Sequence, residues 1–331
     1  MKSFTGKFDL NGVVMAVDSN REDWLGALTR SISAPAAAEG DRAELAVELL
    51  EMEDQEIDAH CPLPGDEYKR GESDVFLDQV VPYSSYQRDE AAWQEIGGYA
   101  RIFVDHAEGR GTIYRRRDRR VINPFFADSF FAVDLMAKLL SCRQFYSIHA
   151  SCAQVNGRGV IITGPGGRGK STSGYALARQ GHPFLNDERV LLKRRETYRA
   201  CSITDLFKLR QEAVDRFFPE LAPIKPFYLP NPDEFCYKTG IMPGLQMATE
   251  CDADILLILK QADQPGSEAR QINPARAVGE LFPVTMNPRN EKENMKKFDF
   301  LTDFLHQITC YQIDFGYDMD EFARLVGELT E

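Results

Sequence analysis

Residues 163–172 read TGPGGRGKST, which places four glycines and one lysine between an apolar run and a helix-like pattern. The segment from Gly164 to Ser171 fits the spacing G-x-x-x-x-G-K-[ST]. Because glycine has no Cβ, successive backbone N–H groups can converge on phosphate oxygens, and a helix that begins near Lys170 directs its positive dipole end there. A flexible turn is the alternative. The strand before the loop and the helix after it favour a phosphate site.

The residues of this loop are predicted to have separate roles in a nucleotide site. We expect Lys170 to contact the β- and γ-phosphates of ATP, and the Ser171 hydroxyl to bind Mg²⁺. The residues predicted to bind the nucleotide are Gly164, Gly166, Gly167, Arg168, Gly169, Lys170, Ser171 and Thr172. A phosphate loop alone does not distinguish a kinase from a motor or a switch.

The stretch FLNDERV, residues 184–190, favours a kinase over a motor. Asp187 follows Lys170 by 17 residues, and its carboxylate can bind Mg²⁺ or accept a proton from an attacking hydroxyl. Motor ATPases usually carry their second acidic motif after a later apolar strand. The late strand of this chain, ILLILK at residues 255–260, ends in lysine instead.

A histidine is predicted to lie near the phosphate loop. Asn156-Gly157 is a strong hairpin signal because both residues tolerate positive φ, so residues 146–155 and 159–163 should form neighbouring antiparallel strands. His149 lies on the first of them, where a neutral imidazole can orient a catalytic carboxylate. A histidine with a purely structural role is the alternative.

Length and composition are those of a folded protein large enough for two domains. The chain has 331 residues, 43% of them hydrophobic. Its apolar runs are far shorter than the roughly 20 residues of a membrane span, and the start MKSFTGKFDL lacks the apolar core of a secretion signal. We therefore expect a cytoplasmic protein with no membrane partner. Seven scattered cysteines without a CxxC pair favour buried thiols over disulfides or a zinc site.

The charge of the chain is concentrated in one acidic segment. Residues 39–78 hold 14 acidic and 3 basic residues, which is −11 of the net charge of −12. This pattern argues against nucleic-acid binding, which needs clustered positive charge. The stretch YRRRDRR at residues 114–120 is the exception. It is predicted to be a solvated loop or a neutralising partner of the acidic segment, with an acidic substrate or a subunit contact as the alternative.

The pattern of elements indicates an α/β fold in two domains. Residues 1–124 are predicted to form a β-rich accessory or substrate-recognition domain, and residues 125–331 a P-loop domain with a mixed sheet. Asp128 or Ser129 is predicted to cap a helix that runs to Cys142. Further helices are predicted at 170–180, 204–218, 294–308 and 318–329, strands at 183–195, 198–203, 253–260 and 310–315, and an irregular proline-rich loop at 219–245.

The stretch HASCAQVNGRGVIITGPGGRGKSTSGYALARQGHPFLNDERVLL, residues 149–192, resembles the catalytic domain of the HPr kinase/phosphorylase family. That family includes serine kinases with a phosphoenolpyruvate-carboxykinase-like fold. The resemblance covers residues 146–192 well and 250–325 faintly, and it does not extend to residues 1–120. It implies a P-loop, mixed-sheet kinase domain like the C-terminal domain of HPr kinase.

The resemblance also implies roles for particular residues. Asp187 would take the proton of the acceptor hydroxyl with support from His149, and Lys170 would bind the phosphates. Arg289, in PVTMNPRN, would be a cation at the transition state. The residues implied to bind Mg²⁺ are Ser171, Asp187 and Glu188, where the family usually has two aspartates at the last two positions.

The resulting function is ATP- and Mg²⁺-dependent phosphoryl transfer to a serine or threonine hydroxyl of a protein or peptide. Relatives of this kind phosphorylate peptides in peptide-tailoring cassettes, and some assemble into homo-oligomers. Reverse phosphorylase chemistry is not predicted. Two alternatives remain, an ATP-gated binding module without catalysis and a small-molecule kinase. A groove lined by Phe217, Phe218, Phe227 and Tyr228 would favour a peptide, whereas simple packing of these rings would not.

Overall fold

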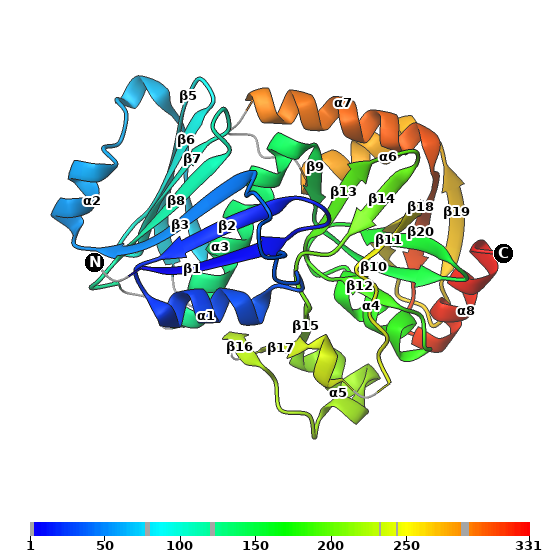
Figure 1. Ribbon diagram of the computed structural model, residues 1–331. Coiled ribbons are helices and arrows are strands. Elements are labelled where there is room, and N and C mark those ends of the chain that lie inside the picture. Colours follow the sequence, from blue (N-terminus) through cyan, green and yellow to red (C-terminus); the bar gives the residue numbers. More distant parts are fainter. Residues whose placement is uncertain (1–2, 77–79, 120–122, 232, 243, 286–290) are drawn as a thin grey trace. The chain divides into compact units, whose positions relative to one another are not determined.

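The computed structural model describes residues 3–76, 80–119, 123–231, 233–242, 244–285 and 291–331. The chain divides into two compact units, and the division falls between Phe145 and Tyr146 (Figure 1). The sequence predicts a domain boundary between residues 124 and 125, which lies about one helix earlier in the chain than this division. Each unit is described separately below.

The first unit is built on one eight-stranded sheet in the order β1-β2-β3-β8-β7-β6-β5-β4. The pairs β2–β3 and β3–β8 are parallel and the other pairs are antiparallel. The strands are β1 (Phe4–Asp9), β2 (Val14–Ser19), β3 (Leu45–Met52), β4 (Lys69–Phe76), β5 (Val80–Arg88), β6 (Ala91–Ile96), β7 (Ala100–Asp105) and β8 (Arg110–Arg116). The helices are α1 (Glu22–Ser31), α2 (Asp54–His60) and α3 (Pro124–Leu140).

Helix α3 belongs to the first unit because it packs against α1 and against β3 and β8. It starts at Pro124, earlier than predicted, so neither Asp128 nor Ser129 caps it. Asp128 instead lies in the second turn, buried, where its carboxylate accepts hydrogen bonds from the Tyr99 hydroxyl and the Arg115 guanidinium. The prediction of a cap was wrong because a buried ion pair, rather than the helix end, satisfies this carboxylate.

Arg115 is the centre of a buried polar network, and its side chain is only 1% exposed. Its Nη2 lies 2.7 Å from Oε2 of Glu51 on β3, and its guanidinium carbon lies 4.1 Å from the centroid of the Trp24 ring on α1. With Asp128 on α3, the network joins the sheet to helices α1 and α3.

The arginine cluster neutralises the acidic segment, as predicted. Arg116 pairs with Asp54, and Arg117 with Glu53. The other prediction, a solvated loop, is wrong for Arg115, because strand β8 carries that side chain into the core.

The second unit contains a nine-stranded mixed sheet in which β12-β10-β11-β18-β14-β13-β9 are neighbours and β20 pairs with both β18 and β19. The strands of the unit are β9 (Phe145–Ile148), β10 (Ala150–Val155), β11 (Arg158–Thr163), β12 (Phe184–Asn186), β13 (Val190–Arg194), β14 (Tyr198–Cys201), β15 (Leu206–Arg210), β16 (Tyr228–Asn231), β17 (Glu234–Lys238), β18 (Glu250–Gln261), β19 (Glu268–Ile272) and β20 (Thr309–Phe315). Its helices are α4 (Lys170–Arg179), α5 (Gln211–Phe217), α6 (Pro274–Leu281), α7 (Glu291–Gln307) and α8 (Met319–Leu329).

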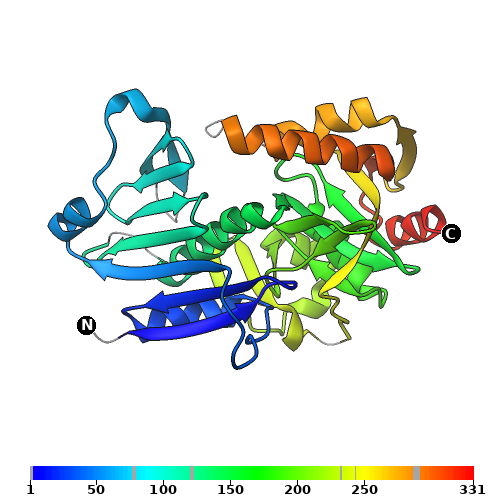
Figure 2. The same cartoon turned by 45° about the horizontal axis from the view of Figure 1, so that its top comes forward.

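Strand β18 lies at the centre of this sheet, parallel to β11 and β20. Its side chains alternate between two apolar cores, with Leu257 in one and Leu256 in the other. Residues of α4 and α8 complete the first core, and residues of α6 and α7 complete the second. Helices therefore cover both faces, as seen from two directions in Figures 1 and 2. This explains why the run ADILLILK is apolar at nearly every position.

Four predictions for the second unit differ from the structure. The predicted helix 204–218 is strand β15 followed by helix α5, because the alternating residues of LFKLR pair with β17. The predicted irregular loop 219–245 contains the antiparallel strands β16 and β17, which complete a three-stranded sheet with β15. The predicted strand 183–195 is interrupted at residues 187–189. The predicted strand 146–155, on which His149 was expected, is likewise divided at that residue into β9 and β10. The other predicted helices and strands are present within a few residues of their expected ends.

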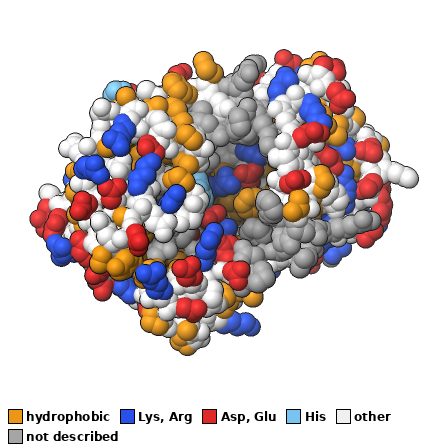
Figure 3. Space-filling model, turned by 180° about the vertical axis from the view of Figure 1, so that it is seen from behind, with side chains coloured by type: hydrophobic (Ala, Val, Ile, Leu, Met, Phe, Trp, Pro, Cys, Tyr) orange, Lys and Arg blue, Asp and Glu red, His pale blue; other side chains and the backbone are white. Residues whose placement is uncertain are grey.

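Three further features concern the charge of the surface, the cysteines and the length of the apolar helices. On the face seen in Figure 3, the described acidic and basic side chains are intermingled, and none of that described surface is broadly basic. Six of the seven cysteines are buried, as expected, and all seven are free thiols. Within the described ranges, no helix is both long and apolar enough to cross a membrane.

Candidate functional site

The glycine-rich loop connects the buried strand β11 to the start of helix α4, as the sequence predicts. Gly169 immediately precedes the helix with a φ of +90°, and a Cβ there would lie 2.6 Å from Cε1 of Phe315. Gly164 has a φ of +148°, and a Cβ there would lie 3.0 Å from the carbonyl oxygen of Leu259. At these two positions, any other residue would have to strain the loop or displace its neighbours.

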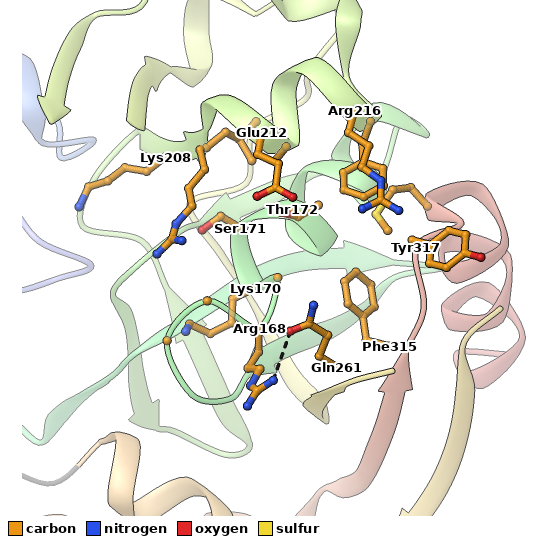
Figure 4. A pocket seen from close by; sticks show the side chains of 18 of the residues that line it. Arg168, Lys170, Ser171, Thr172, Lys208, Glu212, Arg216, Gln261, Phe315 and Tyr317 are labelled. Atoms are coloured by element: carbon orange, nitrogen blue, oxygen red, sulfur yellow. Dashed lines mark hydrogen bonds between the residues drawn. The ribbon is translucent and has the colours of Figure 1, made fainter. Parts of the chain in front are cut away.

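The loop forms one wall of a cavity of about 630 Å³ in the second unit (Figure 4). Of the predicted site residues, those that line it are His149, Gly166, Gly167, Arg168, Gly169, Lys170, Ser171, Thr172 and Glu188. Gly164 lies at the start of the loop, outside the lining, and Asp187 lies behind it. Arg289 falls outside the described residues, so its predicted role stays a prediction.

Lys170 is folded back over its own loop. Its Nζ donates hydrogen bonds to the carbonyl oxygens of Gly164 and Pro165, at 3.1 and 3.2 Å. Burial lowers the pKa of this ammonium, and the nearby carboxylates of Glu188 and Asp187 oppose that shift. The cation is thus held at the loop, close to both acidic residues.

Asp187 follows strand β12 and is only 1% exposed. Its Oδ2 accepts a hydrogen bond of 3.1 Å from the backbone N–H of Lys208, and the Ser171 hydroxyl also hydrogen-bonds to it. Burial, followed by the charge of Glu188, raises the pKa of Asp187 to about 7. This carboxyl group therefore lies directly behind the hydroxyl that the sequence assigns to the metal.

Glu188 faces the cavity from a backbone with a φ of +71°, the left-handed region that residues other than glycine rarely adopt. Its Oε2 lies 3.2 Å from Nζ of Lys208. Burial raises the pKa of Glu188, but the charge of Lys208, with smaller contributions from His149 and Lys170, outweighs it and holds the pKa below its ordinary value. The two neighbouring carboxyl groups thus have opposite pKa shifts, and the strained backbone turns one side chain into the cavity.

His149 lies at the break between β9 and β10. Its side chain contacts the backbone of the turn that carries Asp187 and Glu188. Its Nδ1 lies 3.0 Å from the carbonyl oxygen of Glu188, and a carbonyl can only accept, so Nδ1 carries the proton. Burial lowers the pKa of His149, which favours a neutral ring with Nε2 as an acceptor. The histidine was expected to support the Asp187 carboxylate, but its hydrogen bond instead holds the backbone of the residue that follows.

Lys208 is a cavity residue that the sequence analysis missed. It lies on β15, its side chain is 14% exposed, and it pairs with Glu188. Burial disfavours its charge, yet the carboxylates of Glu188 and Glu234 outweigh burial and raise the pKa of Lys208. The segment LFKLR was predicted to be helical. The alternation of apolar and basic residues in its last four positions, FKLR, was a local signal in favour of a strand.

The four aromatic rings that were predicted either to pack or to line a groove do not share one environment. Phe218 is fully buried, with its ring edge-on to Tyr175 at 4.7 Å between centroids. Phe217 lines the cavity, whereas Phe227 and Tyr228 contact one another outside its lining. Packing accounts for the buried ring, and only one of the four faces the cavity.

The residues expected to hold Mg²⁺ offer only oxygen donors. The Ser171 hydroxyl and the Asp187 carboxyl group touch, and Glu188 lies next in the chain. Among the described residues, no three His, Cys, Asp or Glu side chains form a cluster that would hold a metal by themselves. Mg²⁺ usually takes one or two carboxylates and completes its shell with water and phosphate oxygens, so this small donor set fits it.

The cavity as a whole is suited to a polyanion next to a proton acceptor. Backbone amides of the loop and the N-terminus of α4 lie at its wall together with Lys170 and Lys208. The carboxyl group behind Ser171 has a pKa near neutrality. This combination can hold phosphate groups and receive a proton beside them.

No known family model matches the chain. Over 104 residues, 30% of this chain, the sequence is 32% identical to a protein from Polaromonas naphthalenivorans (strain CJ2) named HPr kinase/phosphorylase. The match spans 28% of that relative's length. The solved structure of the Hpr(Ser) kinase/phosphatase from Coxiella burnetii is 14% identical in sequence; the match covers 55% of this chain and 92% of that chain, with a TM-score of 0.30.

Proposed function

We propose that this protein is an HPr kinase-like phosphotransferase that moves the γ-phosphoryl group of ATP to a serine or threonine hydroxyl of a protein or peptide. The observation that carries the proposal is the Asp187 carboxyl group behind the lining of the cavity, which is only 1% exposed and accepts a hydrogen bond from the backbone N–H of Lys208. Burial, followed by the charge of Glu188, raises its pKa to about 7. A structural turn needs no such group. The name of the Polaromonas relative, a kinase/phosphorylase, supports the same reaction class.

In this proposal the chain positions the reactants and balances their charge, as is general for phosphoryl transfer. The loop amides and Lys170 hold the β- and γ-phosphates, and Lys170 leaves its two carbonyl partners to do so. Asp187 accepts the proton of the acceptor hydroxyl as that oxygen attacks phosphorus. His149 holds the Asp187–Glu188 turn through its hydrogen bond to the backbone.

Mg²⁺, when bound at Ser171, Asp187 and Glu188, would supply positive charge to the phosphate oxygens. Arg289 remains a candidate for a further cation at the transition state. The first unit, with its eight-stranded sheet, would help to recognise the protein or peptide substrate. We also propose that the protein resides in the cytoplasm, where ATP is abundant, and that it assembles into homo-oligomers.

A label-transfer experiment tests the proposed reaction. The protein is incubated with Mg²⁺, ATP labelled in the γ-phosphoryl group, and a heat-treated cell lysate, whose own kinases are inactive, as the source of acceptors. We expect protein-bound label that survives acid and is released by alkali, as phosphoserine and phosphothreonine are. The matched control is Lys170→Ala, which should abolish labelling. Label that appears only as inorganic phosphate, or remains in ATP, would contradict phosphoryl transfer to a hydroxyl.

Lys208 provides a second test that is independent of the sequence motif. We expect Lys208→Met to lower kcat by roughly tenfold to a hundredfold, because a hydrogen bond to a charged group contributes about 1.5–3 kcal/mol and Glu188 loses this partner. The backbone N–H that binds Asp187 is retained in the variant. The measurement is the steady-state rate of label transfer.

The control is Lys238→Met, on the adjacent strand β17. Lys238 pairs with Asp205 at 3.3 Å but does not line the cavity. Its replacement should leave the rate within about twofold of the wild type, since an ion pair outside the site contributes little to the reaction. Equal losses in the two variants would show that Lys208 acts through folding rather than in the cavity.

A further inference from the structure

One end of the cavity holds a cluster of aromatic and guanidinium groups that the phosphate chemistry does not use. The guanidinium carbon of Arg216, on α5, lies 5.0 Å from the ring centroid of Phe217 and 5.2 Å from that of Tyr317. Tyr317 follows β20, so the two rings come from distant parts of the chain. All three residues line the same cavity as the glycine-rich loop.

Tyr317 is 41% exposed, yet its backbone is firmly held. Its N–H donates to the carbonyl of Gln264 at 3.2 Å, and the N–H of Gly316 donates to the hydroxyl of Ser267 at 3.0 Å. The next residue, Asp318, caps helix α8. A ring that is exposed within a cavity on so constrained a backbone offers a preformed apolar face to a ligand.

The cluster lies at the end of the cavity where a nucleoside would extend. In the view of Figure 4, Ser171 and Thr172 lie between Lys208 on one side and Arg216 with Tyr317 on the other. The carboxyl groups proposed to act on the terminal phosphate are at the Lys208 end, where Glu188 pairs with that lysine. A phosphate chain whose terminal group points there directs its ribose and base toward Tyr317.

We propose that Arg216, Phe217 and Tyr317 form the site for the purine base of the nucleotide, an inference that rests on the proposed function. The flat base of a nucleotide can stack on an aromatic ring, and a guanidinium group can contact the other face or the edge of that base. Stacking uses the face that all bases share, so this end of the cavity binds adenine and guanine with similar affinity. Because the two fused rings of a purine offer a larger face for stacking than the single ring of a pyrimidine, the substrate class is a purine nucleoside triphosphate, selected by its flat base rather than by one hydrogen-bonding edge.

The test compares binding of ATP with binding of tripolyphosphate, which has the phosphates but no base. Isothermal titration calorimetry in Mg²⁺ buffer gives Kd for each. We expect Tyr317→Ala to weaken ATP binding by roughly 5- to 150-fold, which corresponds to the stacking of one base. The Kd for tripolyphosphate should stay within about twofold. Tyr317→Phe keeps the ring and should bind both ligands as the wild type does.

A fluorescent variant gives a second readout without activity. The two tryptophans of the chain, Trp24 and Trp93, are both in the first unit, so Tyr317→Trp adds one reporter to the second. Its emission should change with ATP and with GTP but not with tripolyphosphate. Phe298→Ala, which removes a 43%-exposed ring outside the cavity lining, is the matched control and should leave both Kd values unchanged.

The outcomes separate this inference from the proposed function. If the wild type binds neither ATP nor tripolyphosphate, the phosphate site and the base site are both wrong. If it binds both with equal Kd, or if Tyr317→Ala weakens both equally or neither, the phosphate site stands and the base site is overturned. A variant that binds ATP normally but has a raised KM for the acceptor would assign the cluster to the acceptor instead and likewise overturn the inference.

Discussion

Replacing Asp187 with asparagine is expected to lower phosphoryl transfer by about 10²–10⁴-fold while ATP binding changes little, since general-base catalysis typically contributes that much. Burial and the charge of Glu188 raise the pKa of this carboxyl group to about 7, near the pH at which a base is most effective. Asparagine keeps the shape and the hydrogen bond from Lys208 but cannot accept a proton. Single-turnover transfer rates and a separate ATP titration measure the two effects.

The neighbouring carboxylate provides the matched control. Glu188 lines the cavity, whereas the Asp187 side chain is nearly fully buried, so position alone would favour Glu188 as the base. Its pKa, held below the ordinary value mainly by Lys208 despite burial, makes it the weaker base. We therefore expect a smaller loss of rate for Glu188→Gln than for Asp187→Asn. The opposite order would transfer the role of base to Glu188.

In the first unit, Arg115→Met is expected to destabilise the fold by about 3–5 kcal/mol, the usual cost when one partner of a buried ion pair is removed. The guanidinium is 1% exposed and joins Glu51 to Asp128, and both carboxylates would remain buried without it. Methionine fills much of the volume, so the loss reports on charge more than on packing. Urea denaturation followed by tryptophan fluorescence measures it, because both tryptophans belong to this unit.

Arg117→Met is the control for the first unit. Arg117 makes an ion pair of similar length with Glu53, at 2.7 Å, but its side chain is 60% exposed. Exposed pairs contribute about 0–1 kcal/mol, so this variant should remain close to the wild type in free energy of unfolding. If Arg115→Met were no more destabilised than Arg117→Met, the buried network would not be what joins the sheet to its helices.

Much of the second unit follows from local sequence patterns. The Asn156-Gly157 hairpin, the loop after β11 and the helix that starts at Lys170 are all where the sequence predicts them. Each depends on neighbouring residues alone, through the positive φ of Asn156 and Gly157 in the turn and of Gly164 and Gly169 in the loop. The apolar run of β18 likewise identifies a strand covered on both faces.

The errors arose where a distant segment outweighs a local preference. The residues around Lys208 combine helical propensity with a short apolar–basic alternation, and pairing with β17 about thirty positions later decides that they form a strand. Asp128 has the features of a helix cap, but its partners Tyr99 and Arg115 lie earlier in the chain and draw it into the core. Neither partner can be identified from the pattern around the residue itself.

A short run of residues is thus enough to specify the bend of the glycine-rich loop. Each glycine can adopt a positive φ because it has no Cβ, and this freedom does not depend on the rest of the chain. The chemical character of the groups around that loop is a different matter. The raised pKa of Asp187 and the pairing of Glu188 with Lys208 exist only after folding, because burial and charge depend on neighbours that the chain brings together from distant positions.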